Sequence, residues 1–129
     1  MADKYKIALA STDGESVNQH FGRADKFFIY TIDDDVGYDF VETRALLPVC
    51  LGKSHKIPEM ERRVGQLADC KYVAAAKIGP GAESALEQAG ITAMELPGEI
   101  EAAVLKIWKY NQIQKLYKDK LQGQPGNNI

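Results

Sequence analysis

Short apolar runs separated by polar, glycine-containing stretches form the pattern of the first half of the chain. Residues 5–10 and 27–32 are apolar and rich in β-branched or aromatic side chains, which predicts two buried strands. Residues 38–47 alternate between apolar and polar side chains. We therefore expect a third strand, antiparallel to the second across an Asp- and Gly-containing turn at residues 33–37.

The second half of the chain alternates between helices and strands. Pro58 near a first helical position, with apolar side chains at helical spacing after it, predicts a helix that ends at residues 69–71. The elements expected after it are a strand over residues 72–76, a helix opened by the Gly-Pro-Gly sequence 79–81, a strand over residues 91–96 and a helix from about residue 99.

Strands followed by strand–helix alternation are typical of an α/β fold. We expect a mixed sheet with an antiparallel hairpin and with parallel strands joined through helices. With 129 residues the chain is predicted to form one domain, residues 1–122, and a frayed tail, residues 123–129. Ligands of such sheets gather at the carboxyl ends of parallel strands, where the loops after residues 10 and 76 begin.

Composition removes several classes of function. The net charge of −2 gives no overall electrostatic attraction for nucleic acid. No apolar run approaches the roughly 20 residues that span a bilayer, and the N-terminus has no apolar signal-peptide core, so we expect no membrane contact and a cytoplasmic location. Cys50 and Cys70 are expected to be reduced thiols, and two thiols are too few for an all-cysteine metal site.

The polar loop 11–26 between the first two strands holds the first candidate site. It is longer than a hairpin needs, and long loops inside compact domains tend to be functional. His20 lies at its centre and is followed by Phe21, Gly22 and Arg23. A loop histidine beside a glycine and a cation is a candidate ligand for a soft metal or an anion. The alternative is a histidine hydrogen-bonded to the backbone.

Cys50 and His55 are the next candidates, in the connection that leaves the third strand. Their thiolate and imidazole could close over a metal group held by His20. The alternative is an inert thiol and a surface histidine, because one Cys–His pair at this spacing is not diagnostic of zinc. The pattern does not determine whether the pair reaches His20. Cys70, at a helix–strand junction, is expected to pack as a small hydrophobe.

Supporting residues are predicted around these loops. The cations that could offset the charge of an anionic ligand are Arg23, Lys26, Lys53 and Lys56. The sequence 79–81 either exposes helix N-terminal amides to an anion or is a tight turn that lets strand and helix pack closely. Asp13 and Asn18 are expected to shape the first loop through Asx turns.

A series of short motifs covers the chain from about Lys6 to Ile107. They are Ala10-Ser-Thr-Asp-Gly14, Val17-Asn-Gln-His-Phe-Gly-Arg23, Cys50-x4-His55, Leu67-Ala-Asp-Cys70, Ile78-Gly-Pro-Gly-Ala82, and Gly90-Ile91 followed by Pro97-Gly-Glu-Ile100. Together, in this order and spacing, they resemble the dinitrogenase iron–molybdenum cofactor-binding family of NifX and NifY type, which also forms the C-terminal domain of NifB proteins.

The resemblance implies a ribonuclease H-like α/β fold, with a five-stranded mixed β-sheet flanked by helices on both faces. It implies a non-catalytic carrier that holds an iron–sulfur or iron–molybdenum-type cluster transiently, so that the purified apoprotein can be empty. The implied partners are the donor and acceptor proteins of metallocofactor assembly, as in nitrogenase cofactor biosynthesis and nitrogen fixation. The carrier itself is expected to be a monomer.

The resemblance also implies roles for particular residues. His20 occupies the position of the proposed cofactor ligand, within a binding element that includes Phe21, Gly22 and Arg23. Together with His20, the Cys50-x4-His55 motif makes Cys50 and His55 candidate metal ligands. A preassembled cluster already has bridging sulfides, so one or two protein ligands suffice and release stays possible.

Two competing functions remain open. The first is a zinc- or anion-responsive regulatory domain that uses His20, Cys50 and His55. The second is a ribonuclease H-like, metal-dependent nuclease, which needs several carboxylates around two magnesium ions. Asp13, Asp25 and the acidic turn at residues 33–35 do not fall at adjacent strand centres, which disfavours the nuclease.

Overall fold

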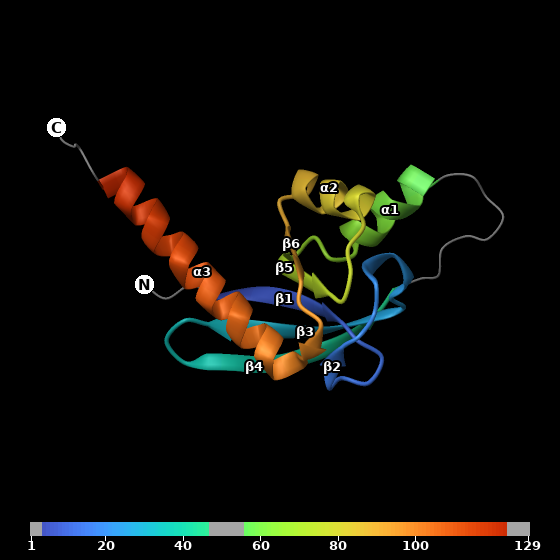
Figure 1. Cartoon of the computed structure of the whole chain (residues 1–129), viewed down its shortest axis with the longest axis horizontal. Coiled ribbons are helices and arrows are strands. Elements are labelled where there is room, and N and C mark those ends of the chain that lie inside the picture. Colours follow the sequence, from blue (N-terminus) through green and yellow to red (C-terminus); the bar gives the residue numbers. More distant parts are fainter. Residues whose placement is uncertain (1–3, 47–55, 124–129) are drawn as a thin grey trace.

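The structure is a computed structural model that describes the backbone of residues 4–46 and 56–123 and the side chains of residues 4–46 and 60–117. Five strands form one mixed sheet in the order β4-β3-β1-β5-β6 (Figure 1). Their bounds are β1 Lys4–Ala10, β3 Lys26–Asp33, β4 Gly37–Ala45, β5 Cys70–Ala75 and β6 Thr92–Glu95. β3 is antiparallel to β1 and β4, whereas β5 is parallel to β1 and β6. The expected mixed sheet is confirmed.

β1 and β5 lie at the centre of the sheet and are buried on both faces because their sequences are nearly continuous apolar runs. Successive side chains of β1 point to opposite faces. Ile7 and Leu9 belong to one core, and Ala8 and Ala10 belong to the other. A sheet of this kind needs an apolar layer on each face.

Helices supply both layers. Their bounds are α1 Lys56–Gly65, α2 Pro80–Gln88 and α3 Ile100–Gly123. α1 and α2 cover the face of Ala8, with Val64 and Leu86 in that core. α3 covers the opposite face through Val104 and Ile107, as its apolar spacing predicts. Helices therefore flank the sheet on both faces, as expected.

Three short elements were not expected from the pattern. β2, Ser16–Val17, pairs antiparallel with β7, Gly98–Glu99, outside the main sheet. A 3-10 turn, η1, occupies Phe21–Arg23. β2 and η1 lie within the long loop after β1, so parts of that loop have regular backbone structure.

The ribonuclease H-like part of the expected fold class was wrong. The nuclease chemistry associated with that class needs carboxylates that converge on metal ions. Among the described residues, no three His, Cys, Asp or Glu side chains are placed to hold a metal ion. Asp13 instead lies in the loop after β1 and accepts hydrogen bonds from the backbone there. A mixed sheet with helices is what the structure supports.

The last helix is longer than the sheet that it covers. The α3 side chains in the core end at Ile107, and Asn111 is the last buried one among those described. From residue 112 to residue 117 no side chain is buried, and the end of α3 extends past the sheet (Figure 1). No helix in the described part of the chain is long and apolar enough to cross a membrane.

Candidate functional site

The loop after β1 is shaped by side chains that bond to its own backbone. The Asp13 carboxylate accepts hydrogen bonds from the N–H groups of Glu15 at 2.9 Å and Ser16 at 3.1 Å. These N–H groups lower the pKa of the Asp13 carboxyl because they stabilise its charged form. The side-chain amide oxygen of Asn18 accepts the N–H of Thr12 at 3.0 Å. The predicted Asx turn is confirmed for Asp13, whereas Asn18 shapes the loop through a bond to a residue six positions earlier and not through an Asx turn.

The second half of the loop is tied to the carboxyl end of β5. The Gln19 carbonyl oxygen accepts the N–H of Ala76 at 2.9 Å, and the N–H of Phe21 donates to the Lys77 carbonyl oxygen at 2.9 Å. His20 therefore forms a parallel bridge with Lys77. The loop extends the sheet edge at which α/β proteins commonly bind ligands.

Phe21 anchors this segment in the core. Its side chain is 0% exposed, and its ring lies 5.7 Å from the ring of Phe27, measured between centroids. Arg63 of α1 is 7% exposed and donates hydrogen bonds to the carbonyl oxygens of Phe21 and Ala24. Burial lowers the pKa of Arg63, and the negative charge of Asp25 opposes this shift. The turn that follows His20 is thus held from two sides.

The residues between these anchors are open to solvent. His20, Gly22 and Arg23 are all exposed. A Cβ atom added at Gly22 would meet no atom within 4 Å, so the space above the turn is free of described protein atoms. Lys77, which sequence reasoning missed, is exposed beside His20, and Lys26 is half-buried. The arrangement can offer one imidazole nitrogen and nearby cations to a large anionic guest.

The other predicted metal ligands, Cys50 and His55, lie outside the described residues, as do Lys53 and the side chain of Lys56. Cys70 is described and is buried. Burial, and secondarily the charge of Asp69, raises the pKa of the Cys70 thiol to about 12. Its packing as a small hydrophobe is confirmed.

The Gly-Pro-Gly sequence begins α2, as predicted. Gly79 caps the helix and Pro80 is its first residue. A Cβ atom at Gly79 or Gly81 would meet nothing within 4 Å. Close packing against the described residues therefore does not require a glycine at either position. The N–H of Ile78, just before this sequence, donates to the Glu95 carboxylate at 2.8 Å.

Arg63 is the structural residue that sequence reasoning missed. A signal for it was present, because residue 63 lies three positions after Met60 and one before Val64, on the apolar face of α1. A cation on such a face needs buried acceptors. The pattern could not name the acceptors, because they are backbone carbonyl groups 42 and 39 residues away in the sequence.

Comparison with known sequences gives a consistent result. Residues 3–110 match the family described as dinitrogenase iron-molybdenum cofactor. The chain is similar to the FeMo cofactor biosynthesis protein NifB of Chlorobaculum tepidum, with 33% identity over 87% of this chain and 26% of that protein. It is also similar to the protein NifX of Klebsiella pneumoniae, with 28% identity over 91% of this chain and 70% of that protein. The chain thus spans about a quarter (26%) of the length of this NifB protein.

Solved structures share the fold. The crystal structure of PH0822 has a TM-score of 0.57 and 21% identity, over 81% of this chain and 90% of that one. The NMR structure of a putative NifB protein from Thermotoga, of the DUF35 family, has a TM-score of 0.52 and 21% identity, over 81% of this chain and 88% of that one. These likenesses replace the ribonuclease H-like assignment, which none of them supports.

Proposed function

The chain belongs to the dinitrogenase iron-molybdenum cofactor family, and from this premise we propose that it is a non-catalytic carrier of an iron–sulfur-type metallocluster. Relatives that match it are named as proteins of FeMo cofactor biosynthesis. The cluster is cargo in this proposal: an iron–molybdenum cofactor, its precursor or a related sulfide cluster. Proteins that donate and accept such a cluster would be the partners.

His20 is the proposed anchor of the cluster. The observation that supports this role is an exposed imidazole on a turn whose neighbours are fixed by the buried Phe21 and Arg63 side chains. A neutral imidazole is a good ligand for iron and related metals. A single such bond to a preassembled cluster is reversible, which is what a carrier needs. Arg23 and Lys77 would offset the negative charge of the sulfides.

We also propose Cys50 and His55 as additional ligands, because their segment follows Leu46, which contacts the end of the His20 loop, and leads into α1, which carries Arg63. At one end, the N–H of Leu46 donates to the Asp25 carbonyl oxygen at 3.0 Å. At the other end, α1 begins at Lys56 and carries Arg63, which holds the turn after His20.

Anaerobic loading tests the proposal. The apoprotein would be incubated with a preassembled iron–thiomolybdate cluster and separated by gel filtration. Charge-transfer absorption should co-elute with the wild type, and His20→Asn should weaken binding by at least about tenfold, the lower range for disturbing a metal ligand's support. The matched control is Gln114→Asn, at an exposed position of α3. Equal binding by wild type and His20→Asn would exclude His20 as the anchor.

Metal analysis separates this function from the regulatory alternative. Protein purified without chelator should contain no stoichiometric zinc if the cargo is a sulfide cluster. Stoichiometric zinc that disappears in His20→Asn would instead favour a zinc-responsive domain built on the same residue. Cys50→Ala and His55→Ala in the same assay would show whether these residues add to the affinity.

A further inference from the structure

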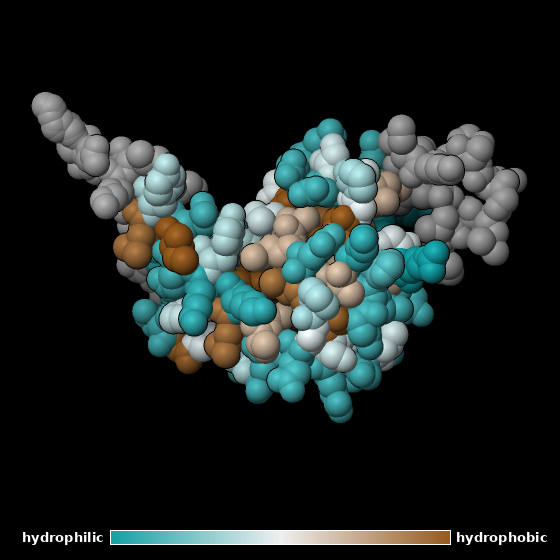
Figure 2. All heavy atoms as spheres, viewed as in Figure 1, coloured by the Kyte–Doolittle hydropathy of each residue, from teal (hydrophilic) through white to brown (hydrophobic). Residues whose placement is uncertain are grey.

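The exposed hydrophobic side chains fall into two groups in the described part of the chain. One group, the hairpin patch, lies at the end of β3 and along β4 and consists of Val36, Phe40 and Val41. The other group, the α3 ridge, consists of Leu105, Tyr110, Ile113, Leu116 and Tyr117. Ile113, Leu116 and Tyr117 are 60%, 68% and 61% exposed. Figure 2 shows hydrophobic side chains on the surface near the C-terminal part of α3. Exposed groups of this kind often mark interaction surfaces.

The two groups carry opposite charges. Residues 33–42, around the hairpin patch, contain no Lys or Arg, and their acidic members are Asp33, Asp34, Asp35, Asp39 and Glu42. Residues 102–117, around the α3 ridge, contain no Asp or Glu, and their basic members are Lys106, Lys109 and Lys115. One chain therefore carries an acidic apolar surface and a basic apolar surface that complement each other.

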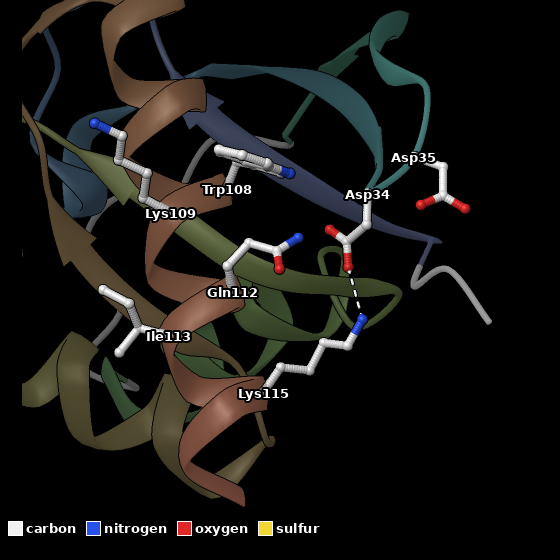
Figure 3. Close-up of a pocket in the computed structure, with 7 residues that line it drawn as sticks. All are labelled: Asp34, Asp35, Trp108, Lys109, Gln112, Ile113 and Lys115. Atoms are coloured by element: carbon white, nitrogen blue, oxygen red, sulfur yellow. Dashed lines mark hydrogen bonds and ion pairs between the residues drawn. The ribbon is translucent and has the colours of Figure 1, made fainter. Parts of the chain in front are cut away.

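Within one copy the hairpin and α3 already contact each other, because the Tyr38 hydroxyl donates to the Glu101 carboxylate at 3.2 Å. The Lys115 amine lies 3.1 Å from the Asp34 carboxylate, beside a cleft of about 620 Å³ that Trp108 also lines. Figure 3 shows the Lys115 side chain directed at Asp34, whereas the side chains of Lys109 and Ile113 point away from the hairpin. Val36 remains 82% exposed. The internal contact thus leaves most of both surfaces uncovered.

We propose that two copies of this chain form a dimer in which the α3 ridge of one copy packs on the hairpin patch of the other. The ridge is roughly 18 Å long from Leu105 to Tyr117, at about 1.5 Å of rise per residue. A single contact along this one ridge would bury less than the roughly 800 Å² per partner that is typical of a stable interface. A two-fold arrangement forms the contact twice, because each copy contributes its ridge and its hairpin. This inference replaces the expectation of a monomer.

The second copy fits better than an unrelated partner because it uses both surfaces at once. An acidic partner protein would cover the ridge and leave the hairpin patch exposed, and a basic partner would do the reverse. The dimer covers both, and its interface lies away from the His20 loop, because the β3–β4 turn follows Asp33, which pairs with Lys4 at the opposite end of β1. The inference therefore stands or falls independently of the proposed cluster site.

Sedimentation velocity with charge-reversed variants tests the dimer. Wild-type protein would be measured from about 1 to 500 μM at low and moderate salt, and we expect a concentration-dependent dimer that salt weakens. Lys109→Glu and Asp35→Lys, the latter beside Val36 in the hairpin patch, should each raise the dissociation constant by about tenfold or more, because each places like charges across the contact. The matched control is Glu87→Lys, on the exposed side of α2, which should leave the dimer unchanged.

Mixing the two variants is the decisive step. In a mixed dimer, each ridge meets a hairpin of opposite charge, so an equimolar mixture should recover dimers that neither variant forms alone. Circular dichroism would confirm that both variants are folded. A wild type that stays monomeric at about 500 μM overturns the proposal. A dimer that Asp35→Lys does not weaken also overturns it, because the contact would then involve α3 without the hairpin.

Discussion

The two ends of the sheet differ in how they use exposed side chains. At the carboxyl ends of β1 and β5, the His20 loop has a fixed backbone and small or polar exposed residues, such as Gly22 and Arg23. At the other end, the β3–β4 hairpin and α3 present large apolar side chains within segments of opposite charge. The first surface suits a small inorganic guest, and the second suits a protein.

The two ends also differ in how much their residues contribute to stability. The loop with the exposed His20 is held by the buried side chains of Phe21 and Arg63, so core packing fixes the position of one polar residue. The hairpin and the ridge expose apolar groups that add little to the fold of a single copy. Mutations in the anchoring of the His20 loop should therefore lower the stability more than mutations of the exposed apolar side chains at the other end.

Phe21→Ala should have the largest effect. The Phe21 ring is fully buried, so its removal should lower the free energy of unfolding by about 3–5 kcal/mol. Phe40→Ala is the matched variant at the other end, where the ring is 52% exposed, and it should cost about 1 kcal/mol or less. Urea unfolding measures both changes. Similar losses in the two variants would show that the ends do not differ in the way described.

Arg63→Met should have the next largest effect. The substitution leaves the carbonyl oxygens of Phe21 and Ala24 without their side-chain donor, which should cost about 1–3 kcal/mol. The neighbouring Arg62→Met, at an exposed position, is the control and should change stability by less than about 0.5 kcal/mol. Hydrogen exchange of the Ala24 amide, which donates to the Phe21 carbonyl, should accelerate only in Arg63→Met.

Local patterns predicted the strands and helices well because burial imposes a period on the sequence. The apolar run of β1 and the spacing of Ile100, Val104 and Ile107 in α3 depend only on neighbours along the chain. The ribonuclease H-like label failed for another reason: it came with the family resemblance, and a layered α/β arrangement is common to many unrelated proteins.

The contacts that build the site could not be predicted in this way. The bridge between His20 and Lys77 and the bonds from Arg63 join residues that are far apart in sequence and carry no shared pattern. Glycine spacing placed His20 in a loop, but the anchoring of that loop on Phe21 depends on the tertiary core. The opposite charges of the hairpin and α3 can be seen in the sequence. The exposure of the apolar side chains between these charges is known only from the structure.

Neutralising the cations beside His20 should have a smaller effect, confined to cargo. Arg23→Gln and Lys77→Gln should each weaken cluster binding by about two- to fivefold at low salt, because exposed charges act through a screened field. Lys109→Gln, at the other end, is the control and should not alter cluster binding. Titration of the absorption at two salt concentrations measures the effect. If the substitutions weaken cluster binding by the same factor at high salt as at low salt, the electrostatic field of these cations is not the cause of the weaker binding.

Asp13→Asn should have the smallest effect, and it should depend on pH. The N–H groups of Glu15 and Ser16 lower the pKa of the Asp13 carboxyl from 3.8, so its contribution to stability is complete above that value and is lost as the pH falls through the lower folded-state pKa. The free energy of unfolding of the wild type should therefore be slightly higher than that of Asp13→Asn at pH 7. In strong acid the two values should become equal. Asp35→Asn, at the exposed hairpin turn, is the matched control for the other end of the sheet.

The Glu15 and Ser16 amide shifts, followed by NMR, should titrate below pH 3.8 in wild type and not in Asp13→Asn. Titration that persists in Asp13→Asn would mean that another acid holds this part of the loop, and the fixed backbone beneath His20 would then need a different explanation.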